Sequence, residues 1–229
     1  MCFSPEADLV AGVVVTAIGI DALRHVPRRE LVPLASLPLV FGVHQLVETF
    51  VWWHLRGDVP DCVGKPAAWI YVVMAMCLVP VLVPFAFARI GAIRSRLLAT
   101  GLVACGIVSA VLLTIGLVRD SIRPEIDGHH IAYHVTTPWQ VFTLGLYILA
   151  ACGPALLANA APLRLFGATN LLVVALLIWL AQSAVVSLWC VWAAVSSVLI
   201  NLYVRRRARV SPEAPGTGEP HRSGTRGSP

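Results

Sequence analysis

The sequence predicts an all-α integral membrane protein, a polytopic bundle of seven transmembrane helices with the N-terminus outside the cytoplasm and the C-terminus inside. Three observations support this prediction. Of the 229 residues, 58% are hydrophobic, only 13% are charged, and long apolar segments follow one another as far as residue 204. Soluble domains carry about 25% charged residues, so this chain has too few polar side chains to cover a surface that faces water. A mean hydropathy of +0.79 agrees with this interpretation.

Each predicted span has roughly the 20 apolar residues that a helix needs to cross the hydrocarbon core. The spans lie at residues 8–24, 32–54, 67–88, 97–118, 139–158, 165–183 and 184–204. The last two are nearly continuous, and we divide them at Gln182 and Ser183 because one helix of that length would exceed a single membrane. Residues 1–204 therefore form the predicted membrane domain. Residues 205–229, rich in Pro, Gly, Ser and charge, are predicted to be a disordered cytoplasmic tail.

The first span begins with a helix start rather than a signal peptide. Ser4 is a suitable cap, Pro5 suits the first helical position, and the acids Glu6 and Asp8 complement the helix dipole. A signal peptide would instead begin with basic residues. At the other end of this span, Asp21 and Arg24 are spaced as an ion pair within one helix.

Basic residues indicate the orientation. With the N-terminus outside, the 17 Lys and Arg residues fall on the inner side, except Arg56, Lys65, Arg119 and Arg123. Cytoplasmic loops carry the excess of basic residues in membrane proteins. The net charge of +5 thus reports topology, and no interleaved basic and aromatic surface predicts binding to nucleic acid.

The second span carries four residues that could form a site: His44, Gln45, Glu48 and Trp52. Their spacing of three and four places them along one helical face. A carboxylate is costly to insert in a membrane and usually faces the bundle interior. Three alternatives remain open here: a hydrogen-bonded structural pair of His44 and Glu48, a ligand, proton-relay or metal site, or a Glu48 that reaches the interface.

The external loop at residues 119–138 contains His129, His130 and His134. On a helical turn, the spacing of His130 and His134 would suit zinc. The alternative is that these histidines are simply solvated. The preceding pair Asp127 and Gly128 is typical of a turn.

Two cysteine positions are candidates for chemistry. Cys2 follows the initiator methionine, where it could act as a nucleophile, remain an inert thiol, or pair with Cys62 outside the cell. Cys190, in the last span, belongs to a stripe of small, weakly polar residues that favours close helix packing.

Four segments carry a resemblance to a known family. They are Met1–Ser4, Phe41–Glu48, His130–Tyr133 and Ser187–Ala194. They resemble an uncharacterised family of bacterial multi-span membrane proteins without an established activity, so the resemblance implies architecture only. We expect a multi-pass protein of the bacterial inner membrane. The matching residues are Cys2, Gln45, Glu48, His130, Tyr133, Trp189 and Cys190. A looser similarity to the seven-span alkaline ceramidases is limited to span number and orientation, because the last span has no His.

Three functions are therefore compatible with the sequence. A metal-assisted membrane enzyme would use Glu48 and Cys2 in catalysis and bind a divalent metal such as zinc through His130, His134 and Glu48. A small-molecule or lipid ligand would contact the remaining candidates, namely His44, Gln45, Trp52, Tyr133, Trp189 and Cys190. A proton- or cation-coupled transporter or sensor would use His44 and Glu48 as a relay. A structural membrane assembly protein would use the same groups to hold helices together. The lipid bilayer is a predicted partner in each case, and the sequence leaves the oligomeric state open.

Overall fold

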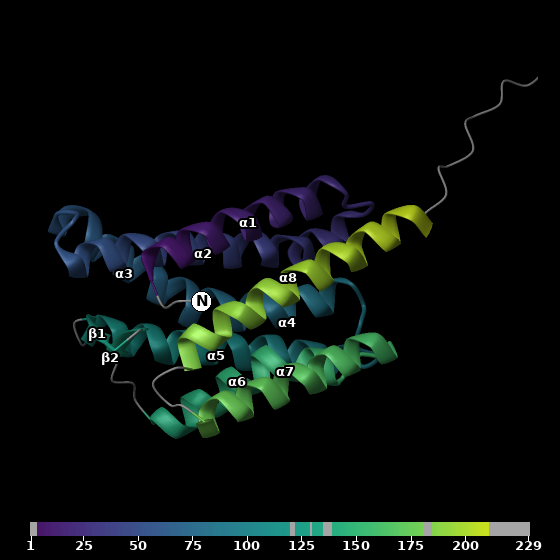
Figure 1. Ribbon diagram of the computed structural model, residues 1–229. Coiled ribbons are helices and arrows are strands. Elements are labelled where there is room, and N and C mark those ends of the chain that lie inside the picture. The colour runs from purple at the N-terminus through teal and green to yellow at the C-terminus, as the bar shows by residue number, and fades with distance from the viewer. Residues whose placement is uncertain (1–3, 120–121, 129, 135–138, 181–184, 211–229) are drawn as a thin grey trace, which may run out of the picture.

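The computed structural model is a bundle of helices that run along one common direction, with a short β-hairpin at one end (Figure 1). It describes residues 4–119, 122–128, 130–134, 139–180 and 185–210. Helices α1 (Pro5–Arg24) and α2 (Val32–Arg56) lie side by side, and a short 3-10 turn, η1 (Arg29–Leu31), leads into α2. Each of the seven predicted spans coincides with a helical segment, with ends that differ by a few residues.

The start of α1 is built as the sequence predicts. The Ala7 N–H donates to the Ser4 hydroxyl at 3.2 Å, and Pro5 occupies the first turn, where its missing N–H costs nothing. Glycines then allow α1 and α2 to approach closely. A Cβ atom on Gly19 would collide with the Leu39 backbone, and one on Gly42 would collide with Thr16. Small residues at such contacts are the usual means of close packing between membrane helices.

The third predicted span is a helix with a wide turn in its middle. It consists of α3 (Asp61–Val73), the π-turn η2 (Met74–Leu78) and α4 (Val79–Arg89). The cause is Pro80, which follows the π-turn and has no N–H to continue the hydrogen-bond ladder. The Ala75 carbonyl accepts instead from the Tyr147 hydroxyl of α6 at 3.0 Å. The irregular turn is thus held by a hydrogen bond from a neighbouring helix.

The second half of the chain continues the bundle with α5 (Arg96–Arg119), α6 (Gln140–Leu156), α7 (Ala161–Leu180) and α8 (Val185–Val210). Helix α5 packs between α4 and α6, while α8 returns to contact α1, α2 and α7. The predicted division at Gln182 and Ser183 lies outside the described residues. Helix α8 runs to Val210, so residues 205–210 of the predicted tail are helical, and residues 211–229 lie outside the described part of the chain.

The external loop forms a hairpin of β1 (Arg123–Asp127) and β2 (His130–His134). The strands are antiparallel, with Asp127 opposite His130, and Gly128 makes the turn at φ +59°, where a glycine is favoured. His130 and His134 therefore lie on a strand, not on the helical turn on which their spacing would suit zinc. In a strand, residues four apart are separated by roughly 13 Å, so the helical spacing argument for zinc no longer applies.

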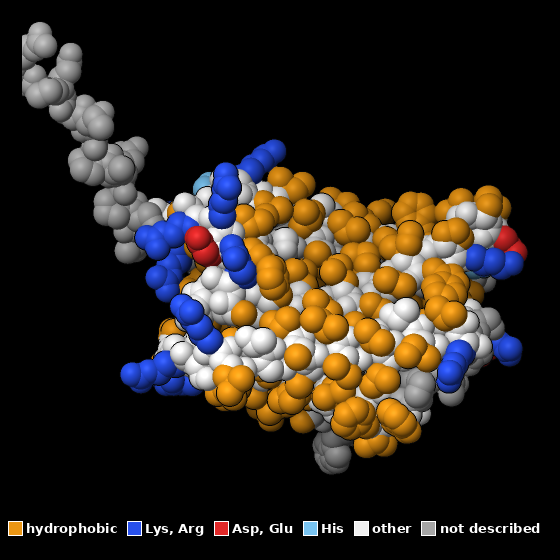
Figure 2. All heavy atoms as spheres, turned by 180° about the vertical axis from the view of Figure 1, so that it is seen from behind, with side chains coloured by type: hydrophobic (Ala, Val, Ile, Leu, Met, Phe, Trp, Pro, Cys, Tyr) orange, Lys and Arg blue, Asp and Glu red, His pale blue; other side chains and the backbone are white. Residues whose placement is uncertain are grey.

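Charged side chains gather at the two ends of the molecule and leave a broad apolar belt between them (Figure 2). Within the described residues, three helical segments are long and apolar enough to cross a membrane: Arg29–Arg56, Asp61–Arg89 and Arg96–Arg119. Many large apolar side chains are exposed on the belt, among them Val10 of α1 and Val111 of α5. Exposed apolar surface of this extent is typical of a protein that contacts lipid.

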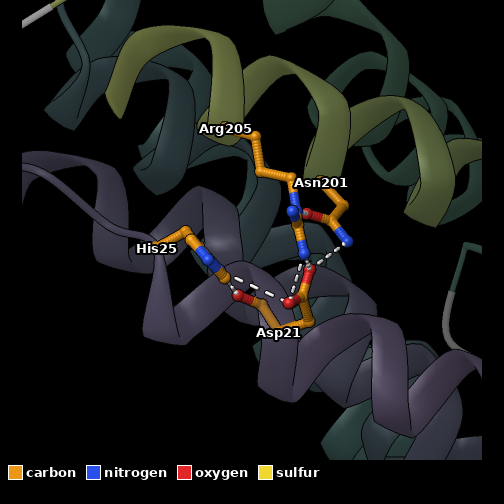
Figure 3. Close-up of polar contacts among 4 residues, drawn as sticks. All are labelled: Asp21, His25, Asn201 and Arg205. Atoms are coloured by element: carbon orange, nitrogen blue, oxygen red, sulfur yellow. Dashed lines mark hydrogen bonds and ion pairs between the residues drawn. The ribbon is translucent and has the colours of Figure 1, made fainter. Parts of the chain in front are cut away.

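A polar clamp ties α1 to α8 at the end of the molecule where both helices finish (Figure 3). The Arg205 guanidinium donates to Asp21 Oδ2 through Nε at 2.9 Å and through Nη2 at 2.6 Å, and Asn201 donates to the same oxygen at 2.8 Å. The His25 ring lies 3.4 Å from the other carboxylate oxygen. Asp21 thus pairs with the last helix, where the sequence suggested Arg24. Only the folded bundle brings Arg205 within reach.

Candidate functional site: a buried carboxyl pair

Two carboxyl groups from different helices meet inside the bundle near the hairpin end. Asp8 comes from the first turns of α1, and Glu48 comes from the middle of α2. Both residues are 0% exposed, and their charges are close enough to interact. The tight packing of α1 on α2 places them together. The prediction that Glu48 faces the bundle interior is confirmed by its burial.

The two carboxyls have few partners. The Trp52 indole N–H donates to Asp8 Oδ2 at 3.0 Å. Among the described residues, no hydrogen bond of standard geometry reaches Asp8 Oδ1 or either oxygen of Glu48, although the Tyr71 phenol faces the Glu48 carboxyl. Buried polar atoms are normally hydrogen-bonded. Three carboxyl oxygens therefore have capacity for a ligand or a proton.

Aromatic rings form one wall of the site. His44 of α2 stacks on Tyr71 of α3 with 4.0 Å between ring centroids, and Tyr71 stacks on Tyr133 of β2 at 4.7 Å. Burial raises the pKa of the Tyr133 phenol well above its usual range, and the Glu48 and Asp8 charges add to this effect. Its hydroxyl therefore stays protonated, and within the described structure it has no hydrogen-bond partner. It is a donor available to a ligand.

The hairpin and one arginine cover the site on its outer side. Ile131 of β2 is 1% exposed and packs with Trp52, Val51, Ala67 and Ala68. The Arg56 guanidinium lies over the Trp52 ring, 5.6 Å from its centroid, and 3.6 Å from a Glu6 carboxylate oxygen. Arg56 is therefore engaged at the surface, above the buried carboxyls.

Several predicted site residues are brought together, and others are not described. Gln45 and Trp52 are buried on the same helix as Glu48, and Tyr133 joins them from the hairpin. The structural pair of His44 with Glu48 is not formed, because His44 stacks on Tyr71 and its Nε2 has no partner among the described residues. Cys62 is an exposed free thiol. The predicted residues whose side chains lie outside the described part are Cys2, His129, His130, His134, Trp189 and Cys190.

The metal prediction finds no support in the residues whose positions are described. No group of three or more His, Cys, Asp or Glu side chains lies close enough to hold a metal ion in that part of the chain. The side chains of His130 and His134 are not among the described ones. Metal binding by these two histidines therefore remains a prediction.

Asp8 and Tyr71 are site residues that the sequence alone does not predict. For Asp8, an acid in a first helical turn is ordinarily explained by the helix dipole. One signal was present: a second acid two residues after Glu6 sits inside an apolar helix, where a carboxyl is costly. Tyr71 gives no such signal, because an aromatic residue in an apolar span is usually part of the packing.

The fold and the buried pair define an α-helical bundle whose apolar helices fit a membrane and whose interior holds two adjacent carboxyls. Residues 1–215 match a family of unknown function, DUF6629, and the chain belongs to this family. No curated protein and no solved structure shows significant similarity to the chain.

Proposed function

We propose that this protein is a seven-span protein of the bacterial inner membrane that binds and exchanges a proton or a small cation at Asp8 and Glu48, as a coupled transporter or sensor. One observation carries the proposal. Glu48 is fully buried, neither of its oxygens has a hydrogen bond of standard geometry among the described residues, and its charge interacts unfavourably with that of a second buried carboxyl, Asp8.

Charge balance supports this function over a structural role. Two buried carboxylates repel each other and lose their hydration, and a bound cation or proton would offset both costs. Among the described residues, the Trp52 indole donates to Asp8 and the Tyr71 phenol faces Glu48, and two neutral donors are too little to balance two charges. A group that only held helices together would be expected to have its oxygens paired, as Asp21 has at the other end of the bundle. A bound proton or cation would restore the balance.

The surroundings favour a small occupant. Tyr133 offers a protonated hydroxyl, and the rings of His44 and Tyr71 close the wall without adding charge. A metal-assisted enzyme is less favoured, because its main support was the helical spacing of His130 and His134, and those residues form a strand.

Infrared spectroscopy of the purified protein in lipid tests the proposal. We expect a band of a protonated carboxyl in a dry environment, and we expect it to change when Na⁺, K⁺, Mg²⁺ or Ca²⁺ is added or the pH is raised. Glu48→Gln should remove the response, while Glu30→Gln, at an exposed position, should preserve it. A wild-type spectrum with no protonated carboxyl and no cation response would contradict the proposal. Stoichiometric zinc that is lost in His130→Ala would favour the enzyme instead.

A further inference from the structure

A second site lies at the opposite end of the bundle from the carboxyl pair. It is a cavity of about 270 Å³ between α2, α4, α6, α7 and α8. Its interior wall includes Leu34, Leu37 and Ala155, all nearly fully buried. Leu199 and Leu202 of α8 also line it, and they are 45% and 48% exposed. The cavity therefore runs from the buried core to the apolar outer surface of the bundle.

Two of the polar side chains in the wall, Asn170 and Trp192, are already paired. Trp192 donates its indole N–H to Asn170 Oδ1 at 2.6 Å, and the Asn170 amide lies 3.3 Å from the Cys152 sulfur. The Trp192 ring also stacks on Phe166, another lining residue. A polar ligand would find no free partner in this pair, so the interior suits a hydrocarbon.

The charge at the rim of the cavity is positive. Arg206 is the only charged residue among the described residues that line the cavity, and it is exposed. It lies in the basic last turns of α8, at the end of the molecule where Lys and Arg side chains gather (Figure 2). An apolar channel with a cation at its mouth complements an apolar chain that ends in an anion.

We propose that this cavity binds one acyl chain of an anionic phospholipid, with the lipid phosphate at Arg206. The volume is near the lower end of ligand pockets, roughly 300 Å³, so the cavity accommodates part of one acyl chain and leaves the rest of the lipid on the exposed apolar rim and in the bilayer. The exposed apolar rim allows the chain to enter sideways from the lipid. This site is independent of the proposed function of the carboxyl pair.

Lipid retention measured by native mass spectrometry tests this proposal. The full-length protein in a mild detergent is mixed with equal amounts of palmitoyl-oleoyl phosphatidylglycerol and phosphatidylcholine. We expect the wild type to retain one phosphatidylglycerol in preference to phosphatidylcholine. Arg206→Gln should weaken this retention by about tenfold or more, because a charged hydrogen bond to the phosphate is lost. Arg209→Gln, an exposed change on the same helix, is the matched control and should retain the lipid.

Ala193→Phe tests the cavity itself. Ala193 is buried in the lining, so a phenyl ring there should fill the space and abolish retention of phosphatidylglycerol. Thermal unfolding of each variant checks that the protein folds. If Ala193→Phe does not fold, the surface variant Arg206→Gln still tests the proposal. Equal retention of the two lipids by the wild type would overturn the proposal, as would retention unchanged in Arg206→Gln. Retention of a free fatty acid, or of a second copy of the chain across the cavity, would also overturn it.

Discussion

Among single residues, the acids at the two ends of the bundle have different surroundings. Asp21 has its carboxylate oxygens shared between Arg205, Asn201 and His25, and it remains partly exposed. Asp8 has one indole donor, and neither oxygen of Glu48 is hydrogen-bonded among the described residues. Carboxyls that are paired stabilise a fold, whereas carboxyls that are buried without partners reduce its stability. This contrast indicates a structural role for Asp21 and supports the proposal that Asp8 and Glu48 bind a proton or a cation.

The hydrogen bond from Trp52 to Asp8 should be worth more than ordinary packing. Trp52→Phe keeps an aromatic ring but removes the N–H together with part of the buried ring volume, and among the described residues it leaves both Asp8 oxygens without a donor. We expect this change to lower the free energy of unfolding by about 1–3 kcal/mol. Thermal unfolding in detergent, followed by circular dichroism, measures it.

The neighbouring Trp53 provides the control. It is half-buried, and its ring contacts Phe50 edge-on at 5.2 Å between centroids. Trp53→Phe should change stability much less than Trp52→Phe. In an Asp8→Ala background the loss caused by Trp52→Phe should become smaller, because the acceptor is gone and only the packing contribution remains. Equal losses in both backgrounds would show that the indole N–H contributes nothing.

Among the elements, the sequence predicted the helices well and the hairpin poorly. Helices in this chain follow from the length of apolar segments, a local property, and each predicted span coincides with a helical segment. The hairpin depends on Ile131 and Tyr133, which share one face of β2 and pack against Ala68 and Tyr71. Alternation over five residues is too short to predict a strand without knowledge of that packing.

The candidate site also contains residues that the sequence predicts and residues that it does not. The face of α2 with Gln45, Glu48 and Trp52 follows from helical periodicity, so it could be predicted from the sequence. Asp8 and Tyr71 could not be added to it, because they come from α1 and α3. Only the packing of these helices on α2 brings them to Glu48.

Close packing of α1 on α2 should be sensitive to a single methyl group. Gly42→Ala would place a Cβ against the Thr16 backbone, which cannot move without separating the helices. We expect a loss of about 1–3 kcal/mol in the free energy of unfolding, the usual cost of overpacking. Thermal unfolding of the variant in detergent measures the loss.

Gly101→Ala in α5 is the matched control, because a Cβ there meets nothing within 4 Å. In a helix interior this change should be neutral or stabilising by roughly 0.5–1 kcal/mol. If both variants shifted stability by the same amount and in the same direction, the close approach of α1 and α2 would not limit stability.

For the whole molecule, charge distribution and helix direction agree with one another. Helices α1 and α8 finish at the same end of the bundle, where Asp21 meets Arg205 (Figure 3). The basic side chains gather at that end, and a broad apolar belt separates them from the hairpin end (Figure 2). A membrane would therefore lie around the belt, with the arginine-rich end in the cytoplasm if the protein follows the positive-inside rule.

Reporter fusions test this orientation at both ends of the belt. The last turn of α8 contains Arg207 and Arg209, and each arginine moved into the membrane centre costs about 2.5–3.5 kcal/mol on insertion scales. We therefore expect a fluorescent protein fused after Val210 to fold in the cytoplasm and fluoresce. Alkaline phosphatase inserted after Asp58, in the turn between α2 and α3, should be active because it lies outside. Phosphatase activity from a fusion after Val210 would contradict the seven-span topology with an external N-terminus. If the insertion after Asp58 were then inactive, the bundle would be inverted, and the carboxyl pair would lie in the cytoplasmic half of the membrane, where it would exchange its proton or cation with the cell interior.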